Sequence, residues 1–358
     1  MSEQKSPKRR GVRAPEPPAA LVSIANPPPA LPTGVPAAEF REHVLSVPPD
    51  MAGSRLDQSL ARLLPQYSRA RLQGWIEAGA VLVDGRRLRG RDKVLGGERV
   101  LITARIEATE QVLAQPLPLD VVFKDRALLV INKPPGLVVH PGAGNAGHTL
   151  QNALLAFDPQ LALVPRAGIV HRLDKDTSGL LVVARTPEAH KALVEAIAER
   201  AVERHYIAIC VGLMTGGGTV DEPIGRHRSL RTRMAVRSDG RPAVTHYRIV
   251  KRFRAHTMVR AELETGRTHQ IRVHLAHIGY PLVGDPVYGG RKRLPAGSTP
   301  ELAAALAAFK RQALHAARLK LTHPVSGRDI EWTAALPQDM TRLVAAMEED
   351  QRTGGRDV

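Results

Sequence analysis

The sequence has little cysteine, few aromatic residues and no apolar run as long as a membrane span. A single cysteine in 358 residues, Cys210, excludes a disulfide framework and a metal site built on cysteines. Because Cys210 lies in an apolar run, residues 206–211, we expect a small core residue, and a chain with one cysteine fits the reducing cytoplasm. Aromatic residues make up 3% of the chain, which leaves few rings for stacking on bases. The missing long apolar run argues against a membrane protein.

Acidic residues are also in deficit, with 35 Asp and Glu against 51 Lys and Arg, which gives a net charge of +16. A charge of this sign and size favours a polyanionic partner, either nucleic acid or an anionic membrane surface. No long basic amphipathic helix stands out, so we prefer nucleic acid. The 43% hydrophobic content and the length predict a soluble globular protein with two domains.

Composition divides the chain into five parts. Proline, alanine and scattered basic residues dominate the first part, which has too few core-forming residues to offset the entropy of ordering. Pro116 and Pro118 mark a linker further along. We therefore expect a disordered basic tail (1–44), a small domain (45–108), a linker (109–118), a large domain (119–345) and a C-terminal tail (346–358).

The small domain is predicted to contain two helices and a tight turn. Leucines recur at helical spacing from Leu56, Ser68 is a candidate cap for a second helix, and Asp84-Gly85 is typical of a hairpin turn. This arrangement resembles the S4 RNA-binding module. Its arginines cluster on a compact element instead of alternating with acids, so we favour RNA contact over a plain solvated surface. The candidate RNA-contacting residues are Arg55, Arg69, Arg71, Arg86, Arg87 and Arg89.

The large domain alternates short apolar runs, turns and a few helices. Thr186 and Thr299 each precede a proline and are typical caps, which predicts helices over residues 187–200 and 300–318. Short apolar runs with turn residues between them begin near Val121. The mixture predicts an α+β fold with mainly antiparallel strands.

A polar turn at residues 171–179, His-Arg-Leu-Asp-Lys-Asp-Thr-Ser-Gly, carries the most informative residues of the chain. It leads into the apolar run 180–184, which we expect to be a buried strand. A carboxylate on a loop anchored by such a strand can be aimed at a ligand. Asp174 stands in a strongly basic chain, where an isolated carboxylate hinders phosphate binding, so a chemical role is favoured over a salt-bridged loop.

Two further segments carry candidate functional residues. In the first, residues 203–208, an uncommon aromatic residue, Tyr206, opens a strand. In the second, residues 264–274, Gly266 ends a strand and Thr268 is a candidate cap for the next helix. The structural alternatives are a half-buried strand tyrosine and a solvated helix.

Two other patterns suggest cofactors or metals but lack the accompanying residues. Residues 142–147 match G-x-G-x-x-G, yet a dinucleotide site also needs an acid about 20 residues later, and residues 163–167 contain none. We prefer a flexible glycine loop to a dinucleotide-dependent oxidoreductase. The histidines at 269, 274 and 277 have neither cysteines nor an H-E-x-x-H pattern beside them, so we predict no metal.

Together these segments resemble the bacterial pseudouridine synthases that act on large-subunit rRNA, over roughly residues 45–345. The motif at 171–180 and the run 265–274, Thr-Gly-Arg-Thr-His-Gln-Ile-Arg-Val-His, carry the resemblance. The resemblance implies an α+β pseudouridine synthase fold, with a mainly antiparallel mixed sheet, flanking helices and a central cleft, preceded by a small S4-like domain. It also implies isomerisation of uridine to pseudouridine without a metal or nucleotide cofactor.

Residues 217–224, 234–236, 242–248 and 281–290 are most similar to branch D of that family, which acts on helix 69 of 23S rRNA. A sister branch with the same layout acts elsewhere on that rRNA, which is one alternative. A catalytically silent RNA-binding assembly factor is another. The implied partner is 23S rRNA or the assembling large ribosomal subunit, and our default is a monomer that acts in the cytoplasm.

The resemblance also assigns roles to single residues. Asp174 is the catalytic carboxylate, which either attacks C1′ or removes the C2′ proton, and Arg272 is its cationic partner. Tyr206 packs on the base and is a candidate for proton removal from C5, while Arg172 fills the gap left by the flipped uridine. The other candidate substrate-binding residues are His171, Arg267 and Gln270. Residues 226–260 hold 11 Lys and Arg against one acid, which adds Arg228, Arg231 and Arg233 to the candidate RNA contacts.

Overall fold

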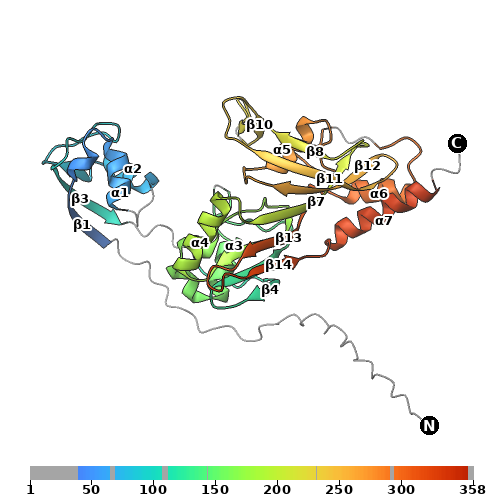
Figure 1. Cartoon of the computed structure of the whole chain (residues 1–358), viewed down its shortest axis with the longest axis horizontal. Coiled ribbons are helices and arrows are strands. Elements are labelled where there is room, and N and C mark those ends of the chain that lie inside the picture. The colour runs from blue at the N-terminus through green and yellow to red at the C-terminus, as the bar shows by residue number, and fades with distance from the viewer. Residues whose placement is uncertain are drawn as a thin grey trace, which may run out of the picture. The chain divides into compact units, whose positions relative to one another are not determined.

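The computed structural model describes residues 39–64, 69–106, 112–142, 144–230, 232–290 and 294–353. The chain divides between residues 111 and 112 into two compact units, here called the N-terminal and C-terminal units (Figure 1). Each unit has a hydrophobic core of its own.

The N-terminal unit packs two helices on a small antiparallel sheet with strand order β1-β3-β2. Leu56, Leu60 and Leu72 are fully buried in its core, which confirms the predicted leucine-spaced helix. Asp84 and Gly85 have φ values of 45° and 74° and form the predicted tight turn. Ser68, the expected cap, lies outside the described residues. The elements are β1 (Glu39–Ser46), η1 (Pro49–Met51), α1 (Leu56–Leu63), α2 (Arg69–Glu77), β2 (Val81–Val83) and β3 (Arg99–Ile106).

The first strand corrects the expected boundary of the N-terminal tail. We expected disorder through residue 44, but β1 begins at Glu39 and pairs along its length with β3. Local composition could not predict this, because the partner strand lies about sixty residues further along the chain. Residues 1–38 lie outside the described part.

The C-terminal unit is built on a mixed sheet that has nine strands among the described residues, in the order β4-β5-β6-β13-β7-β12-β11-β8, with β14 paired to β13. Every pairing in it is antiparallel except that of β6 with β13. The α+β prediction with mainly antiparallel strands is confirmed. The strands are β4 (Val121–Lys124), β5 (Leu128–Lys133), β6 (Ser178–Ala184), β7 (Glu203–Val211), β8 (Gly218–Asp221), β11 (Val244–Arg252), β12 (His256–Leu263), β13 (Leu314–Thr322) and β14 (Asp329–Thr333).

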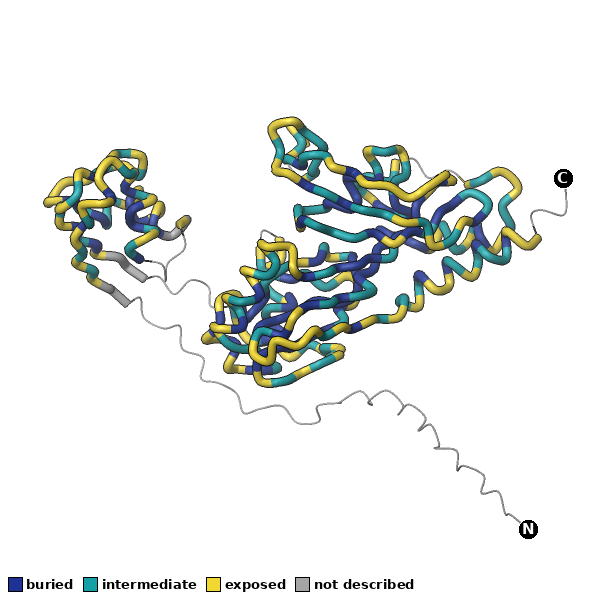
Figure 2. The backbone as a smooth tube through the Cα atoms, viewed as in Figure 1, coloured by how far each residue is buried: buried dark blue, intermediate teal, exposed yellow. Residues whose placement is uncertain are grey.

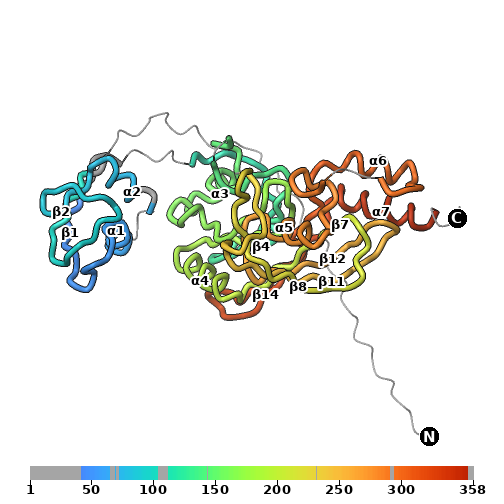
Figure 3. The backbone as a smooth tube through the Cα atoms, turned by 90° about the horizontal axis from the view of Figure 1, so that it is seen from above, coloured from blue at the N-terminus to red at the C-terminus, as the bar shows by residue number. Residues whose placement is uncertain are grey.

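Helices cover both faces of the central strands. On β5, Leu129 and Ile131 pack in the core that contains α3, while Leu128 and Val130 pack in the core that contains α4. β6 is buried at every position, as Figure 2 shows for the centre of the sheet. α6 and α7 lie side by side at one end of the unit (Figures 1 and 3). The helices are α3 (Leu150–Phe157), η2 (Pro159–Leu163), η3 (Pro165–Gly168), α4 (Pro187–Ala198), α5 (Gln270–His277), α6 (Pro300–Ala308) and α7 (Gln338–Thr353), and β9 (Ile224–Arg226) and β10 (Met234–Val236) form a separate hairpin.

The prediction for residues 300–318 is half wrong. Thr299 caps α6 as expected, but this helix ends at Ala308 and the chain enters β13 at Leu314. β13 lies between β6 and β7, so its pairing across the sheet overrides the helical propensity of an alanine-rich stretch. By contrast, the helix predicted from Thr186 is confirmed as α4.

The C-terminal part also differs from the expected tail. α7 continues to Thr353, with Met347 and Asp350 buried. Asp350 accepts hydrogen bonds from Arg254 at 2.9 and 3.1 Å, which ties the helix to the end of β11. At the other end of the unit, Asn152 donates to the Leu113 carbonyl at 2.7 Å, so part of the expected linker is bound to α3.

Candidate active site

Asp174 stands on the turn that leads into β6, so a rigid buried strand fixes its backbone. The Thr177 amide donates to the Asp174 carbonyl at 3.1 Å and closes the turn. Gly179, at the start of β6, has φ of 112°, and a Cβ there would lie 2.3 Å from the Ala316 carbonyl oxygen. The glycine therefore lets β6 and β13 approach closely just after the turn that carries Asp174.

A buried lysine, Lys133, stabilises this turn through hydrogen bonds. The Lys133 ammonium donates to the carbonyls of Pro134, Leu137 and Lys175 at 2.8, 2.9 and 2.8 Å. All three of its hydrogens are used, so Lys133 holds the end of β5 against the residue that follows Asp174. The sequence alone does not reveal this role, and its one local signal is a lysine at the end of an apolar strand.

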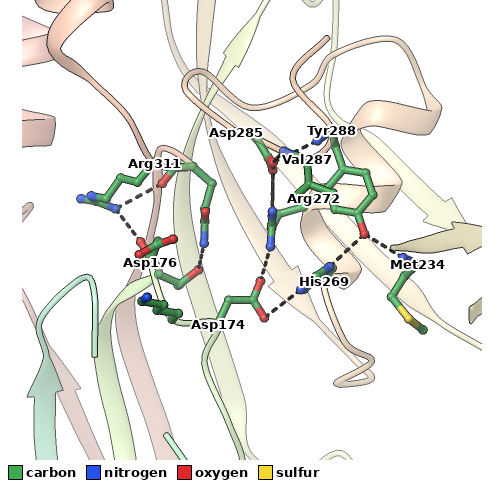
Figure 4. A network of polar contacts seen from close by, with 12 residues as sticks. Asp174, Asp176, Met234, His269, Arg272, Asp285, Val287, Tyr288 and Arg311 are labelled. Atoms are coloured by element: carbon green, nitrogen blue, oxygen red, sulfur yellow. Dashed lines mark hydrogen bonds and ion pairs between the residues drawn. The ribbon is translucent and has the colours of Figure 1, made fainter. Parts of the chain in front are cut away.

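A second brace comes from the segment before β13. Arg311 donates to the Asp176 carbonyl at 3.1 Å (Figure 4), and Gln312 donates to the Thr177 hydroxyl at 3.1 Å. Arg311 is itself held by Asp339 of α7 at 2.6 and 2.9 Å. The position of the turn that carries Asp174 therefore depends on residues about 135 and 165 places further along the chain.

Arg272 of α5 connects Asp174 to a second carboxylate, Asp285. Its Nη1 donates to Asp174 at 2.9 Å, while Nε and Nη2 donate to Asp285 at 2.7 and 2.9 Å (Figure 4). Burial alone lowers the pKa of the guanidinium, but the bonds and charge of Asp285, with that of Asp174, raise it. Burial likewise works to raise the pKa of Asp285, and Arg272 lowers it overall. The result is a buried, fully ionised cation with one nitrogen aimed at Asp174.

His269 faces the other oxygen of Asp174. Its backbone is left-handed, with φ of 58°, and it occupies the cap position before α5 that we had expected Thr268 to fill. Its Nε2 lies 3.9 Å from Asp174 Oδ1, and its Nδ1 lies 2.8 Å from the hydroxyl of Tyr288, which also accepts from the Met234 amide at 2.9 Å (Figure 4). Burial lowers the pKa of His269, so its ring is neutral at neutral pH.

Tyr206 and Asp174 line the same cavity, of about 620 Å³. Tyr206 is 5% exposed, and burial raises the pKa of its phenol. A neutral phenol packs well against a base and is a weak proton acceptor. All seven residues predicted to be catalytic or substrate-binding line this cavity: His171, Arg172, Asp174, Tyr206, Arg267, Gln270 and Arg272.

The predicted substrate-binding residues differ in their exposure and in how many of their polar groups already bond to the protein. Arg172 is exposed at the cavity wall, and Arg267 donates through Nε to the Pro242 carbonyl at 3.0 Å. Gln270 is buried, and both ends of its amide are engaged by protein groups, among them the Arg267 amide and the Val244 carbonyl. Its geometry is that of a brace for the loop before α5.

The predicted RNA contacts lie on both units. Arg86, Arg87 and Arg89 are exposed beside the β2 turn, and Arg69 is exposed at the start of α2. Arg55 is exposed in part but pairs with Asp57 at 2.7 Å. In the loop between β9 and β10, Arg228 is exposed and Arg233 is half-buried, whereas Arg231 and the side chain of Arg71 lie outside the described part.

The cofactor and metal patterns have structural explanations. Gly142 and Asn145 exchange backbone hydrogen bonds in a turn, and α3 begins five residues later, capped by Thr149. Within the described ranges no group of histidine, cysteine or acidic residues has the geometry of a metal site. In the same ranges, no helix combines the length and the apolar character needed to cross a membrane. Cys210 is buried in the core, as predicted.

Comparisons with known proteins agree with this geometry. The family model for RNA pseudouridylate synthase matches residues 127–277, and that for the S4 domain matches residues 54–100. Ribosomal large subunit pseudouridine synthase D of Escherichia coli O157:H7 is 56% identical over 306 residues, covering 85% of this chain and 94% of that protein. Its counterpart in Xanthomonas campestris is 56% identical over 304 residues, covering 85% and 92%. The solved structure of human RNA pseudouridylate synthase domain containing 4 covers 64% of this chain and 93% of its own, with 26% identity and a TM-score of 0.52.

Proposed function

The chain belongs to the RNA pseudouridylate synthase family, and from that premise we propose that it isomerises uridines of 23S rRNA in the large ribosomal subunit. The similarity to the two relatives named for the large subunit covers 85% of this chain and 94% and 92% of those proteins. Helix 69 is the site we propose, because two of the segments that resemble branch D hold residues of the cavity in place. Asp285 accepts from Arg272, and Val244 accepts from Gln270. We further propose that the protein acts as a monomer in the cytoplasm.

The observation that carries the proposal is the pair of Asp174 and Arg272. A carboxylate held by a buried arginine stays oriented while a base covers it. An ionised carboxylate can attack C1′ or remove the C2′ proton, and both routes break the bond between N1 and C1′. Arg272 is oriented by Asp285, so the pair is preorganised before RNA binds.

The other cavity residues have supporting roles in this proposal. Tyr206, buried and neutral, packs on the flipped uracil, and Arg172, exposed at the wall, occupies the space that the uridine leaves in its helix. Arg267 and His171 contact the substrate, and Gln270 positions the loop that carries Arg267. The exposed arginines of the N-terminal unit and of the β9–β10 hairpin bind phosphates.

The test uses purified protein and two transcripts of 23S rRNA, one with helix 69 and one from a region without it. Pseudouridine is mapped at nucleotide resolution after incubation with wild type or Asp174→Asn. Modification of helix 69 by the wild type alone supports the proposal. Modification of the other transcript alone would place the activity at a different site of the rRNA. No modification of either transcript, or of isolated large subunits that lack pseudouridine, would favour a non-catalytic assembly factor.

A further inference from the structure

Arg204 is a second buried arginine of the active-site cavity, and it lacks the partners that Arg272 has. It is 5% exposed and lies on β7 two residues before Tyr206, so both side chains emerge on the same face of the strand. Among the described residues no carboxylate lies within ion-pair distance of its guanidinium. Its Nε is buried without any hydrogen-bond partner. A buried charge without a counter-ion is costly, so its presence in the cavity points to a partner that arrives with the substrate.

His171 adds an unpartnered donor to the same cavity. Its Nε2 accepts the amide hydrogen of Val182 at 3.2 Å, so the ring proton of the neutral imidazole sits on Nδ1. Nδ1 is buried and has no hydrogen-bond partner. Burial, followed by the charge of Arg204, lowers the pKa of His171 to about 3, which keeps the ring neutral. His171 therefore has one N–H donor, at Nδ1, without an acceptor in the protein.

The loop before α5 makes room for the guanidinium. A Cβ at Gly266 would lie 3.0 Å from Nη1 of Arg204, which places the guanidinium against the backbone of the loop that carries Arg267. Arg204, His171, Gly266, Tyr206 and Asp174 all line the one cavity. The unpaired donors thus share the space in which the proposed function places the uracil.

The proposed reaction creates negative charge in that space. When the bond between N1 and C1′ breaks, its electron pair stays with the uracil, where it spreads over N1 and the two carbonyl oxygens. This holds whether Asp174 bonds to C1′ or removes the C2′ proton. The charge is neutralised when C5 uses this electron pair to bond to C1′, while Asp174 leaves C1′ or returns its proton to C2′. The C5 proton then passes to a base, and N1 takes up a proton. Fixed donors that meet such a charge stabilise the transition state more than the neutral ground state.

We propose that Arg204, together with the Nδ1–H of His171, stabilises the negative charge on the departing uracil. The inference rests on the proposed function. The two arginines then have different roles: Arg272 orients Asp174, while Arg204 stabilises the leaving group.

The test begins with Arg204→Met, which keeps the length of the side chain and removes its charge, and with Arg204→Lys, which keeps the charge. Single-turnover rates are measured at saturating protein on an RNA that wild type modifies. We expect the methionine variant to be slower by about 100-fold or more, as on loss of an oxyanion-hole donor, and the lysine variant to recover at least about tenfold. Lys191→Met, on the exposed face of α4, controls for loss of a positive charge elsewhere.

Two further measurements separate this role from its alternatives. RNA affinity is measured in the Asp174→Asn background with and without Arg204→Met, and thermal unfolding is measured for each variant. Stabilisation of the leaving group predicts unchanged affinity and an unchanged or raised Tm, because an unpaired buried charge is removed. The departing base of 5-fluorouridine is a more stable anion than uracil. With 5-fluorouridine at the target, Arg204→Met should therefore slow the reaction by a smaller factor than with uridine.

The outcomes that overturn the proposal are distinct. Weaker RNA binding with an unchanged single-turnover rate would make Arg204 a phosphate contact. A lower Tm with no recovery in the lysine variant would make it a structural residue. Absence of any modification by wild type would instead contradict the proposed function itself.

Discussion

The guanidinium of Arg272 is held at two nitrogens by Asp285, at 2.7 and 2.9 Å, which leaves its Nη1 for Asp174. Asp285 is in turn fixed by the amides of Val287 and Tyr288 at 2.9 and 3.0 Å. A carboxylate at the surface of the cavity thus owes its orientation to a second carboxylate that is almost fully buried.

Replacing Asp285 with asparagine should therefore damage both catalysis and stability. Arg272 loses its counter-ion, so we expect the turnover number to fall about 10- to 100-fold through misplacement of Asp174. The free energy of unfolding should fall by about 3 kcal/mol, because a buried charge is left poorly paired. Single-turnover kinetics and urea unfolding measure the two effects. Asp329→Asn, an exposed carboxylate paired with Lys320, should change neither.

Removing the positive charge at Arg86, Arg87 and Arg89 should weaken RNA binding without slowing the chemical step. All three are exposed in the N-terminal unit. The slope of log affinity against log salt should become shallower by about 2 to 3 in the triple alanine variant, as expected for the loss of three phosphate contacts. The triple lysine variant keeps the charge and should retain the wild-type slope. A wild-type slope in the alanine variant would show a solvated surface that RNA does not touch.

The basic loop between β9 and β10 should behave in the same way. The double variant Arg228→Ala and Arg231→Ala should raise KM more than it lowers kcat, because phosphate contacts act on binding. Steady-state kinetics at constant salt separates the two constants. Equal losses in both would point to damage to folding or to the catalytic residues.

α7 should contribute to the stability of the C-terminal unit, although its last residues looked like a tail in the sequence. Met347 is 1% exposed, so Met347→Ala should lower the free energy of unfolding by about 2 to 5 kcal/mol. Glu349→Ala on the same helix, where the side chain is 44% exposed, is the control and should be near neutral. Urea unfolding of both variants decides the matter, since a disordered tail would leave both unchanged.

Stability should fall as the pH drops below about 6.5, where an unfolded histidine takes up a proton. Burial lowers the pKa of His256 to about 4 in the folded state. Between about pH 6.5 and pH 4 the unfolded state therefore binds more protons than the folded state, so acid favours unfolding. At pH 5 this one histidine costs up to about 2 kcal/mol of stability. Urea unfolding at pH 7.5 and pH 5 should show a smaller difference in His256→Gln than in wild type. Replacing the exposed His277 should leave that difference unchanged.

The sequence was sufficient for features that are encoded locally. Thr186 before Pro187 predicted the start of α4, and Asp84-Gly85 predicted the tight turn after β2. Both predictions succeeded because caps and tight turns depend on a few adjacent residues. The predicted catalytic residues Asp174, Tyr206 and Arg272 line one cavity as a set, although they lie on a loop, a strand and a helix.

The features that the sequence did not reveal depend on long-range contacts. The expected helix over residues 300–318 includes the start of β13, because nothing within these residues shows that β6 and β7 flank that strand. Lys133 and Asp285 were missed for the same reason: their partners, Lys175 and Arg272, are recognisable once the fold brings them together. His269 replaced Thr268 as the cap of α5, since its left-handed backbone turns its ring toward Asp174 and Tyr288.

The most direct test of the account is pseudouridine mapping of large-subunit rRNA from cells that lack this protein, complemented with wild type or with Asp174→Asn. The account predicts that helix 69 loses its pseudouridines and that wild type alone restores them. Restoration by both versions would contradict the role of Asp174. An unchanged helix 69 with a different site left unmodified would contradict the proposed target.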